Sequence, residues 1–267
     1  MNSIVLPLKV HAVKLEYRRL KIANMPHGQF VTKHGKKYVY VTYDPEDCKI
    51  SSRHPRRLLA ASKMGKPYAD VIAEYLELNR EYMSLLNEWN SRYGFTPPKV
   101  AFPIRQFYDP HKMNNDFFDR QTERLGKYVP DNPTVSDHGE LKSKNELMVA
   151  DLLKSMGIPF KYETEVIFKD SKETINPDYL ISFYEIDRCS YVEVLGMGDK
   201  LDYSFRTTNK IYGFSQETYR PGREVIYIFF YDKQNFDGDY VVSQILSAFN
   251  DMIPDDALIW NEDADAV

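Results

Sequence analysis

Cysteine is almost absent from this chain of 267 residues: Cys48 and Cys189 stand alone and far apart. Two such residues signal neither a disulfide framework nor a zinc knuckle, a usage typical of a reducing compartment, so we expect a cytoplasmic protein. Long apolar runs are also missing. The longest, Val225 to Tyr231, is far too short to cross a bilayer, so we expect no membrane partner. The six histidines show no metal-ligand spacing.

Charge is distributed unevenly, although the net charge is only −4. Residues 1–69 hold 14 Lys or Arg against 4 Asp or Glu, whereas the remainder holds 35 acidic against 21 basic residues. A basic segment beside an acidic one is typical of an enzyme that handles a polyanion with a carboxylate site. A basic surface that only contacts solvent gives the same pattern, and charge alone does not separate the two.

The local patterns divide the chain into three regions. Residues 1–95 form a basic N-terminal module, with a β-hairpin around His34-Gly35 and a helix over 67–93, where apolar residues recur at three- and four-residue steps. Residues 96–139 are rich in Pro, Asn and Asp, which indicates a linker or a covering loop. Residues 140–267 form the third region.

The third region has the clearest succession of elements. Its patterns predict the order α-β-β-β-α-β-α, with helices at 141–156, 200–214 and 241–249 and strands at 160–168, 175–183, 191–195 and 225–230. Short strands that follow one another and then a crossover helix predict an α/β fold with a mixed sheet flanked by helices.

Two acidic residues fall in neighbouring predicted strands. Asp178 follows Pro177 at the start of one strand, and Glu193 lies between two valines in the next. Two carboxylates brought close together are unfavourable unless a cation lies between them. Hard oxygen ligands on a rigid frame suit Mg²⁺, which supplies most of the chemistry of phosphodiester hydrolysis. The pair therefore predicts a divalent-metal site.

The ordered segments resemble the PD-(D/E)XK nuclease superfamily, which has a restriction-endonuclease-like core. The resemblance is dense from about residue 139 to 230 and rests on Pro177-Asp178, Ser143–Glu146, Gly157–Glu163 and Glu193–Asp199. The last segment is similar to a variant bacterial subgroup with a Glu-x-Leu-Gly-Met strand end. Leu195 stands where the family has its lysine. In the variant subgroup a lysine on the following helix takes that place, and Lys210 matches its spacing.

The resemblance implies an endonuclease that hydrolyses DNA with Mg²⁺, for which Mn²⁺ would substitute. It implies that Asp178, Glu193 and the Val194 carbonyl bind the metal, and that Glu146 and Lys210 complete the catalytic set. Arg206 is a second candidate for the role of Lys210. Cutting both strands would favour a homodimer or two successive events. The alternative is a catalytically inactive nuclease-fold subunit that binds nucleic acid in a defence or mobile-element system, and Leu195 is the best argument for it.

Basic residues of the first region predict a grip on the phosphate backbone of DNA. They lie at the hairpin tip and in the acid-free segment that follows: Lys33, Lys36, Lys37, Arg53, Arg56 and Arg57. Tyr38 and Tyr40 stand where they would stack on bases of a single-stranded segment. Lysines at a hairpin tip also protect an edge strand from pairing with another chain.

The acidic residues have structural interpretations as well. Ser143 and Glu146 fit a capping box at a helix start. Asp178 fits a turn position. Glu193 fits an ion pair with Lys210 or Arg206.

Glu163 and Glu165 alternate in a predicted strand. We therefore expect both at exposed positions.

Overall fold

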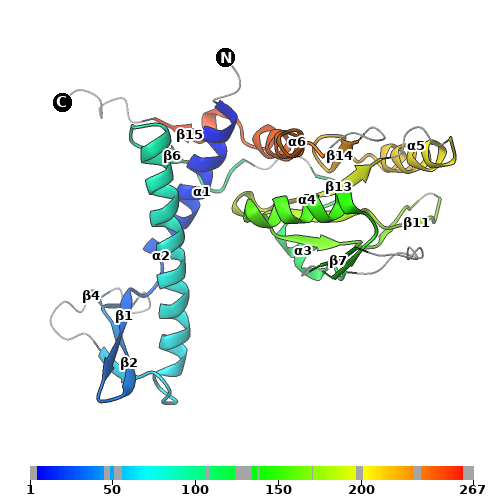
Figure 1. The fold of residues 1–267 in the computed structure, drawn as a ribbon. Helices are drawn as coiled ribbons and strands as arrows, with labels where there is room; N and C mark the ends of the chain where they lie inside the picture. Colours follow the sequence, from blue (N-terminus) through cyan, green and yellow to red (C-terminus); the bar gives the residue numbers. More distant parts are fainter. Residues whose placement is uncertain are drawn as a thin grey trace. The chain divides into compact units, whose positions relative to one another are not determined.

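The computed structural model describes residues 5–44, 49–50, 56–105, 109–123, 134–136, 139–169, 171–196, 201–230 and 236–260 (Figure 1). The chain divides into two compact units. Unit 1 comprises residues 1–10 and 103–257, and unit 2 comprises 11–102 and 258–267. Most of the predicted linker, 96–139, thus belongs to unit 1. Among the described residues, no helix combines the length and apolar character that a membrane span requires.

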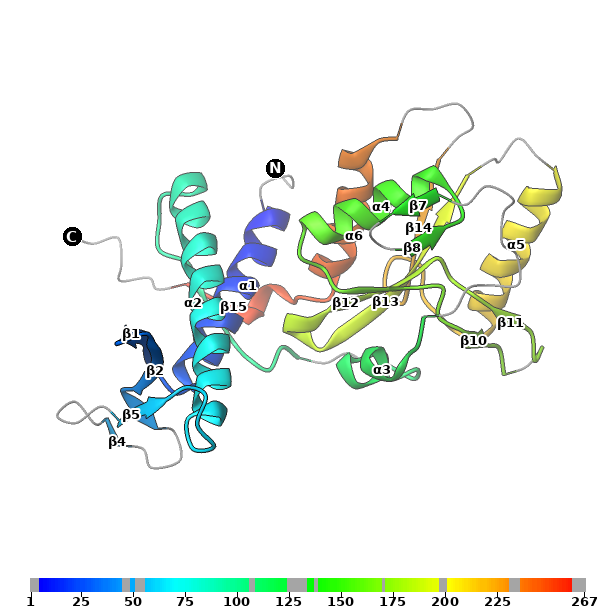
Figure 2. The ribbon, with the colours of Figure 1, turned by 60° about the horizontal axis from the view of Figure 1, so that its bottom comes forward.

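A four-stranded mixed sheet forms the centre of unit 1 (Figure 2). Its order is β14-β13-β12-β9, where β9 is Phe160–Tyr162, β12 Tyr179–Phe183, β13 Arg188–Leu195 and β14 Val225–Phe229. β12 runs antiparallel to β9 and β13, whereas β13 and β14 are parallel. Every residue of β12 is buried. The predicted mixed α/β architecture is confirmed at this level.

Helices cover both faces of this sheet: α3 (Asn115–Arg120), α4 (Lys144–Ser155), α5 (Leu201–Gln216) and α6 (Gly238–Asp251). Leu180 belongs to a buried cluster that contains Phe118 of α3 and Phe214 of α5. Phe183, which points to the other face, stacks on Phe249 of α6 with ring centroids 4.9 Å apart. The Tyr179 hydroxyl, on that same face, donates to the Glu146 carbonyl of α4 at 2.7 Å.

Two predicted strands of unit 1 are interrupted. The run 160–168 divides into β9 and β10 (Val166–Ile167), and 175–183 divides into β11 (Thr174–Ile175) and β12. The first break follows Tyr162, where Glu163 adopts a left-handed backbone with φ of +48°. The predicted linker contains α3 and further short elements, and the remaining elements of unit 1 are β7 (Thr134–Ser136), β8 (Gly139–Leu141), η1 (Tyr184–Ile186) and η2 (Asp255–Ala257).

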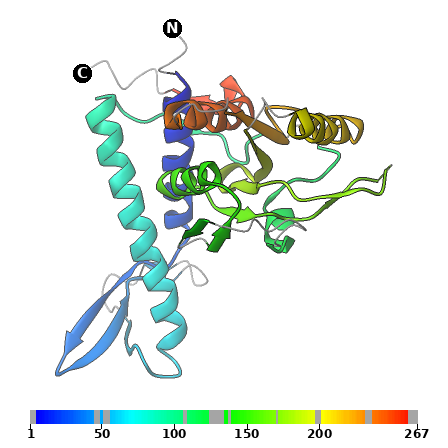
Figure 3. The same ribbon diagram turned by 45° about the vertical axis from the view of Figure 1, so that its right-hand side comes forward.

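Unit 2 contains the predicted hairpin and helix, seen together in Figure 3. The hairpin β1 (Gly28–Lys33) and β2 (Lys36–Val41) forms a sheet with β5 (Arg56–Leu59), and Val39 and Val41 pack against Ile72 of α2 (Lys66–Arg92). The long helix α1 (Val5–Ala23), whose first residues belong to unit 1, was not predicted. Short pairs complete the unit: β3 (Tyr43–Asp44) with β4 (Lys49–Ile50), and β6 (Lys99–Val100) with β15 (Leu258–Ile259).

Candidate active site

Asp178, immediately before β12, faces Glu193 of the neighbouring strand β13. The register pairs Tyr179 with Val192, so Asp178, the residue before β12, stands opposite Glu193. Residues directly opposite in an antiparallel pair direct their side chains to the same face. The Val194 amide donates to Oδ2 of Asp178 at 2.6 Å, which holds this carboxylate against β13. The structure therefore brings the two predicted metal ligands together.

Burial makes this carboxylate pair electrostatically unfavourable. The Glu193 side chain is fully buried, and Asp178 is partly buried. Burial raises the pKa of Asp178 well above its ordinary value, and the charge of Glu193 raises that pKa further. Burial likewise raises the pKa of Glu193, against the opposing effect of Lys210. Without a cation, the two groups hold protons more tightly than exposed carboxylic acids do.

Lys210 of α5 is the main positive charge beside the pair. Its Nζ donates to both carboxylate oxygens of Glu193, at 2.8 and 3.1 Å. Phe214, one helical turn further along α5, is fully buried in the core cluster and so fixes this face of the helix toward the sheet. Arg206, one turn earlier, is exposed. The geometry thus favours Lys210 over Arg206 as the cation of the site.

Glu146 caps the start of α4, and its charge also acts on the carboxylate pair. Its amide donates to Ser143 Oγ at 3.2 Å, and that hydroxyl donates to Glu146 Oε1 at 2.8 Å, so the cap is present. Its Oε2 accepts from the Tyr162 hydroxyl at 2.6 Å and from the Lys142 amide at 3.2 Å. The charge of Glu146 also raises the pKa of both Asp178 and Glu193, which places it within the same electrostatic cluster.

Glu163 is a fourth carboxylate of this cluster, and the expectation that it is exposed is wrong. Its side chain is fully buried and forms an ion pair with Lys142. Its amide donates to the Asp178 carbonyl at 3.1 Å. Strand alternation failed here because β9 ends at Tyr162. The position of Glu163 within the segment that resembles the nuclease family was the available signal. Glu165, also expected to be exposed, is partly buried.

Replacing Glu163 with Gln tests the structural role of this residue. We expect the free energy of unfolding to fall by about 2 kcal/mol, because the partly buried ammonium of Lys142 loses its charged partner. Chemical denaturation measures the change, with the nearby, less buried Glu165→Gln as a matched control. Equal stability of the Glu163 variant and the wild type would show that the ion pair is unimportant.

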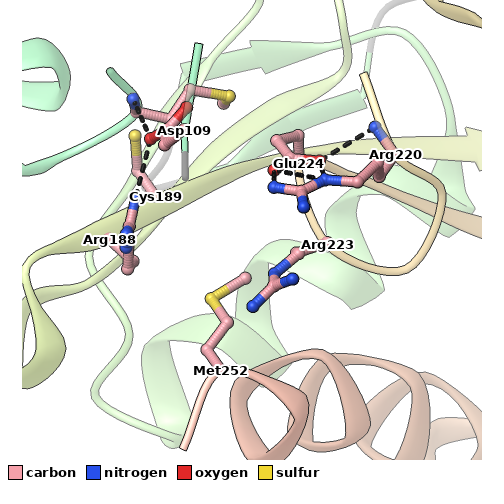
Figure 4. Close-up of a pocket in the computed structure, with 8 residues that line it drawn as sticks. Asp109, Arg188, Cys189, Arg220, Arg223, Glu224 and Met252 are labelled. Atoms are coloured by element: carbon pink, nitrogen blue, oxygen red, sulfur yellow. Dashed lines mark hydrogen bonds and ion pairs between the residues drawn. The ribbon is translucent and has the colours of Figure 1, made fainter. Parts of the chain in front are cut away.

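A small hollow lies at the other end of β13 (Figure 4). Arg188 donates to Oδ2 of Asp109 at 2.7 Å, and Arg220 forms an ion pair with Glu224. The space of about 10 Å³ has room for roughly one water molecule. These two ion pairs hold the surrounding segments together, so we interpret the hollow as a structural cluster. It is lined by Asp109, Met113, Arg188, Cys189, Arg220, Arg223, Glu224 and Met252.

The predicted nucleic-acid contacts belong to unit 2. The three lysines of the hairpin and Arg57 are exposed, whereas Arg53 lies outside the described residues. Strand alternation separates them: Lys33 and Lys36 pair on the same face as Arg57, whereas Lys37 falls at a position of the opposite face. The predicted cations whose side chains the structure describes therefore divide between the two faces of the sheet.

Whether the carboxylate cluster suits a metal ion depends on how many oxygen ligands it can provide. Within the described residues, no group of three or more His, Cys, Asp or Glu side chains is arranged to hold a metal ion. Asp178 and Glu193 provide two hard oxygen ligands, so a cation here would also need backbone, water or substrate oxygens, as Mg²⁺ sites commonly do.

No family model, no curated protein and no solved structure matches the chain.

Proposed function

We propose that unit 1 hydrolyses phosphodiester bonds of DNA with a divalent cation, Mg²⁺ or Mn²⁺ in its place, held by Asp178, Glu193 and the Val194 carbonyl. The observation that carries this proposal is the pair of facing carboxylates at two central strands, with a lysine bound to the buried member. The resemblance of the surrounding segments to PD-(D/E)XK nucleases supports a restriction-endonuclease-like core.

The charge of the cluster supports a divalent cation. Among the described residues, the charges of Glu146 and Glu193 act on Asp178, Lys210 pairs with Glu193, and Lys142 acts on Glu193 and pairs with a fourth carboxylate, that of Glu163. With all six groups ionised, the cluster carries an excess of two negative charges. Retaining that excess in a buried setting is costly, and bound protons or one divalent cation relieve it.

Each residue near the pair then has a distinct role. The cation, when bound, neutralises phosphate charge and activates water. Lys210 balances the charge of Glu193, and its ammonium would be the group that contacts a phosphate oxygen of a bound substrate. Both oxygens of Glu146 already accept hydrogen bonds from its surroundings, so Glu146 acts as a positioning residue for the loop before α4 and for Tyr162. A homodimer would bring two such sites to the two strands of a duplex.

An inactive nucleic-acid-binding subunit is the second candidate function. One observation favours it: Lys210 contacts both oxygens of Glu193, which is the closed ion pair expected where a carboxylate no longer serves a metal. The presence of Asp178 beside that pair argues against it, because a second, partly buried carboxylate without a metal only destabilises the fold.

Cleavage by the Glu193→Gln variant separates the two functions. We expect the wild type to cut DNA only when Mg²⁺ or Mn²⁺ is added, and Glu193→Gln to lose this activity. Glu224→Gln is the matched control, because Glu224 is also a buried acid of unit 1 with a basic partner, Arg220. Agarose-gel assays on circular and linear DNA give the result. Equal cleavage by wild type and Glu193→Gln would contradict the enzyme proposal.

A further inference from the structure

The β1-β2-β5 sheet of unit 2 has two chemically different faces. Val39 and Val41 of β2 are buried against Ile72 of α2. Because side chains alternate along a strand, Tyr38 and Tyr40 point to the opposite face, where both are partly buried. This second face, called the tyrosine face below, consists of Gln29, Val31, Lys33, Lys36, Tyr38, Tyr40, Arg57 and Leu59 by the register of the three strands.

The charge on the tyrosine face is exclusively positive. Lys33, Lys36 and Arg57 are exposed. The strands β1, β2 and β5 contain no Asp or Glu. On these three strands the tyrosine face therefore presents cations that attract a polyanion, and no acidic side chain that would repel it.

The arginine on this face contacts both tyrosines. The Arg57 guanidinium lies over the Tyr38 ring, 5.6 Å from its centroid. Arg57 stands directly opposite Tyr40 across the strands, and a hydrogen bond with Tyr40 raises the pKa of Arg57. Flat aromatic rings and guanidinium planes are the groups on which unstacked bases bind.

We infer that the tyrosine face binds single-stranded nucleic acid, with bases stacked on Tyr38, Tyr40 and the Arg57 plane and phosphates near Lys33 and Lys36. In a duplex the base faces are enclosed by their neighbours, and such a surface would gain only phosphate contacts. The inference rests on the proposed nuclease function and adds to it the class of substrate: a nucleic acid with a single-stranded segment. The binding itself requires neither metal nor cleavage.

Binding of an abasic strand tests the stacking directly. Fluorescence anisotropy in EDTA, with the Glu193→Gln protein, compares a labelled oligothymidylate, an abasic strand of equal length and a duplex. We expect the oligothymidylate to bind about 10-fold or more tightly than the abasic strand, since each stacked base contributes roughly this factor. Equal affinity for the two strands, or tighter binding of the duplex, would overturn the inference.

Variants on the two sheet faces locate the binding surface. Tyr38→Leu with Tyr40→Leu should remove most of the preference for the strand with bases, whereas Tyr38→Phe with Tyr40→Phe should retain it and guards against misfolding of the leucine variant. Lys37→Ala, on the opposite face, should leave the preference unchanged. A leucine variant with the wild-type thermal midpoint and undiminished preference would contradict the inference. Because these measurements exclude metal, they stand apart from any failure of the cleavage assay.

Discussion

Asp178→Asn is expected to lower Mg²⁺-dependent cleavage at least about 100-fold, while the metal-free variant is as stable as the wild type or more stable. Changes to groups that only support metal ligands already cost 10–100-fold, so loss of a ligand should cost more. Stability should not fall, because Asn keeps an acceptor for the Val194 amide and removes one of two facing carboxylates. Cleavage rates and metal-free thermal midpoints measure the two effects.

The pH dependence of stability gives an internal check on this variant. The folded-state pKa of Asp178 is raised, so protonation favours the folded state and the metal-free wild type loses stability as pH rises above the ordinary pKa of a carboxylic acid. The Asn variant lacks this group and should lose less stability as pH rises above about 3.9, the pKa of an unperturbed Asp. Parallel stability curves for the two proteins would show that folding does not raise the pKa of Asp178.

Lys210→Met is expected to reduce cleavage by about 100-fold or more, the typical effect of removing one group that stabilises developing charge. It should also destabilise the metal-free protein by about 3 kcal/mol, because the buried Glu193 carboxylate loses its partner. This loss should be smaller at acidic pH, where Glu193 is protonated. Steady-state kinetics and denaturation at two pH values measure both effects.

Two further variants assign the Lys210 effect. Arg206→Met, one turn earlier on α5, should retain most activity. Lys210→Met combined with Glu193→Gln should recover much of the lost stability, since the fully buried charge of Glu193 is removed together with its partner. Near-normal turnover of Lys210→Met would transfer the role to Arg206 or another cation. A double variant as unstable as the single one would show that Lys210 acts through packing rather than charge.

Local patterns predicted the parts of the fold that depend on periodicity. The helix α2 and the strands β12 and β13 came from apolar residues whose spacing is independent of distant contacts. The long helix α1 was missed: its start lies in unit 1 and its remainder in unit 2, where Val13 and His11 are buried. Burial of polar residues in a helix arises from tertiary packing, which periodicity alone does not show.

The candidate site was only partly accessible from sequence. Asp178 and Glu193 were found because strand neighbours along the chain commonly pair, and the register places them opposite each other. The Lys142–Glu163 ion pair was not found, because it depends on the left-handed backbone at Glu163 that ends β9. Lys36 and Lys37 were assigned to the hairpin tip; alternation places them on opposite sheet faces because β2 extends back to Lys36.

Anomalous diffraction from crystals grown with Mn²⁺ tests the central claim most directly. We expect one strong peak between the carboxylates of Asp178 and Glu193, at about 2.0–2.6 Å from their oxygens, the range that hard divalent cations cover. Nζ of Lys210 should be withdrawn from Glu193. A map with the Lys210–Glu193 ion pair intact and no peak beside it, at Mn²⁺ concentrations that saturate other sites, would contradict the account.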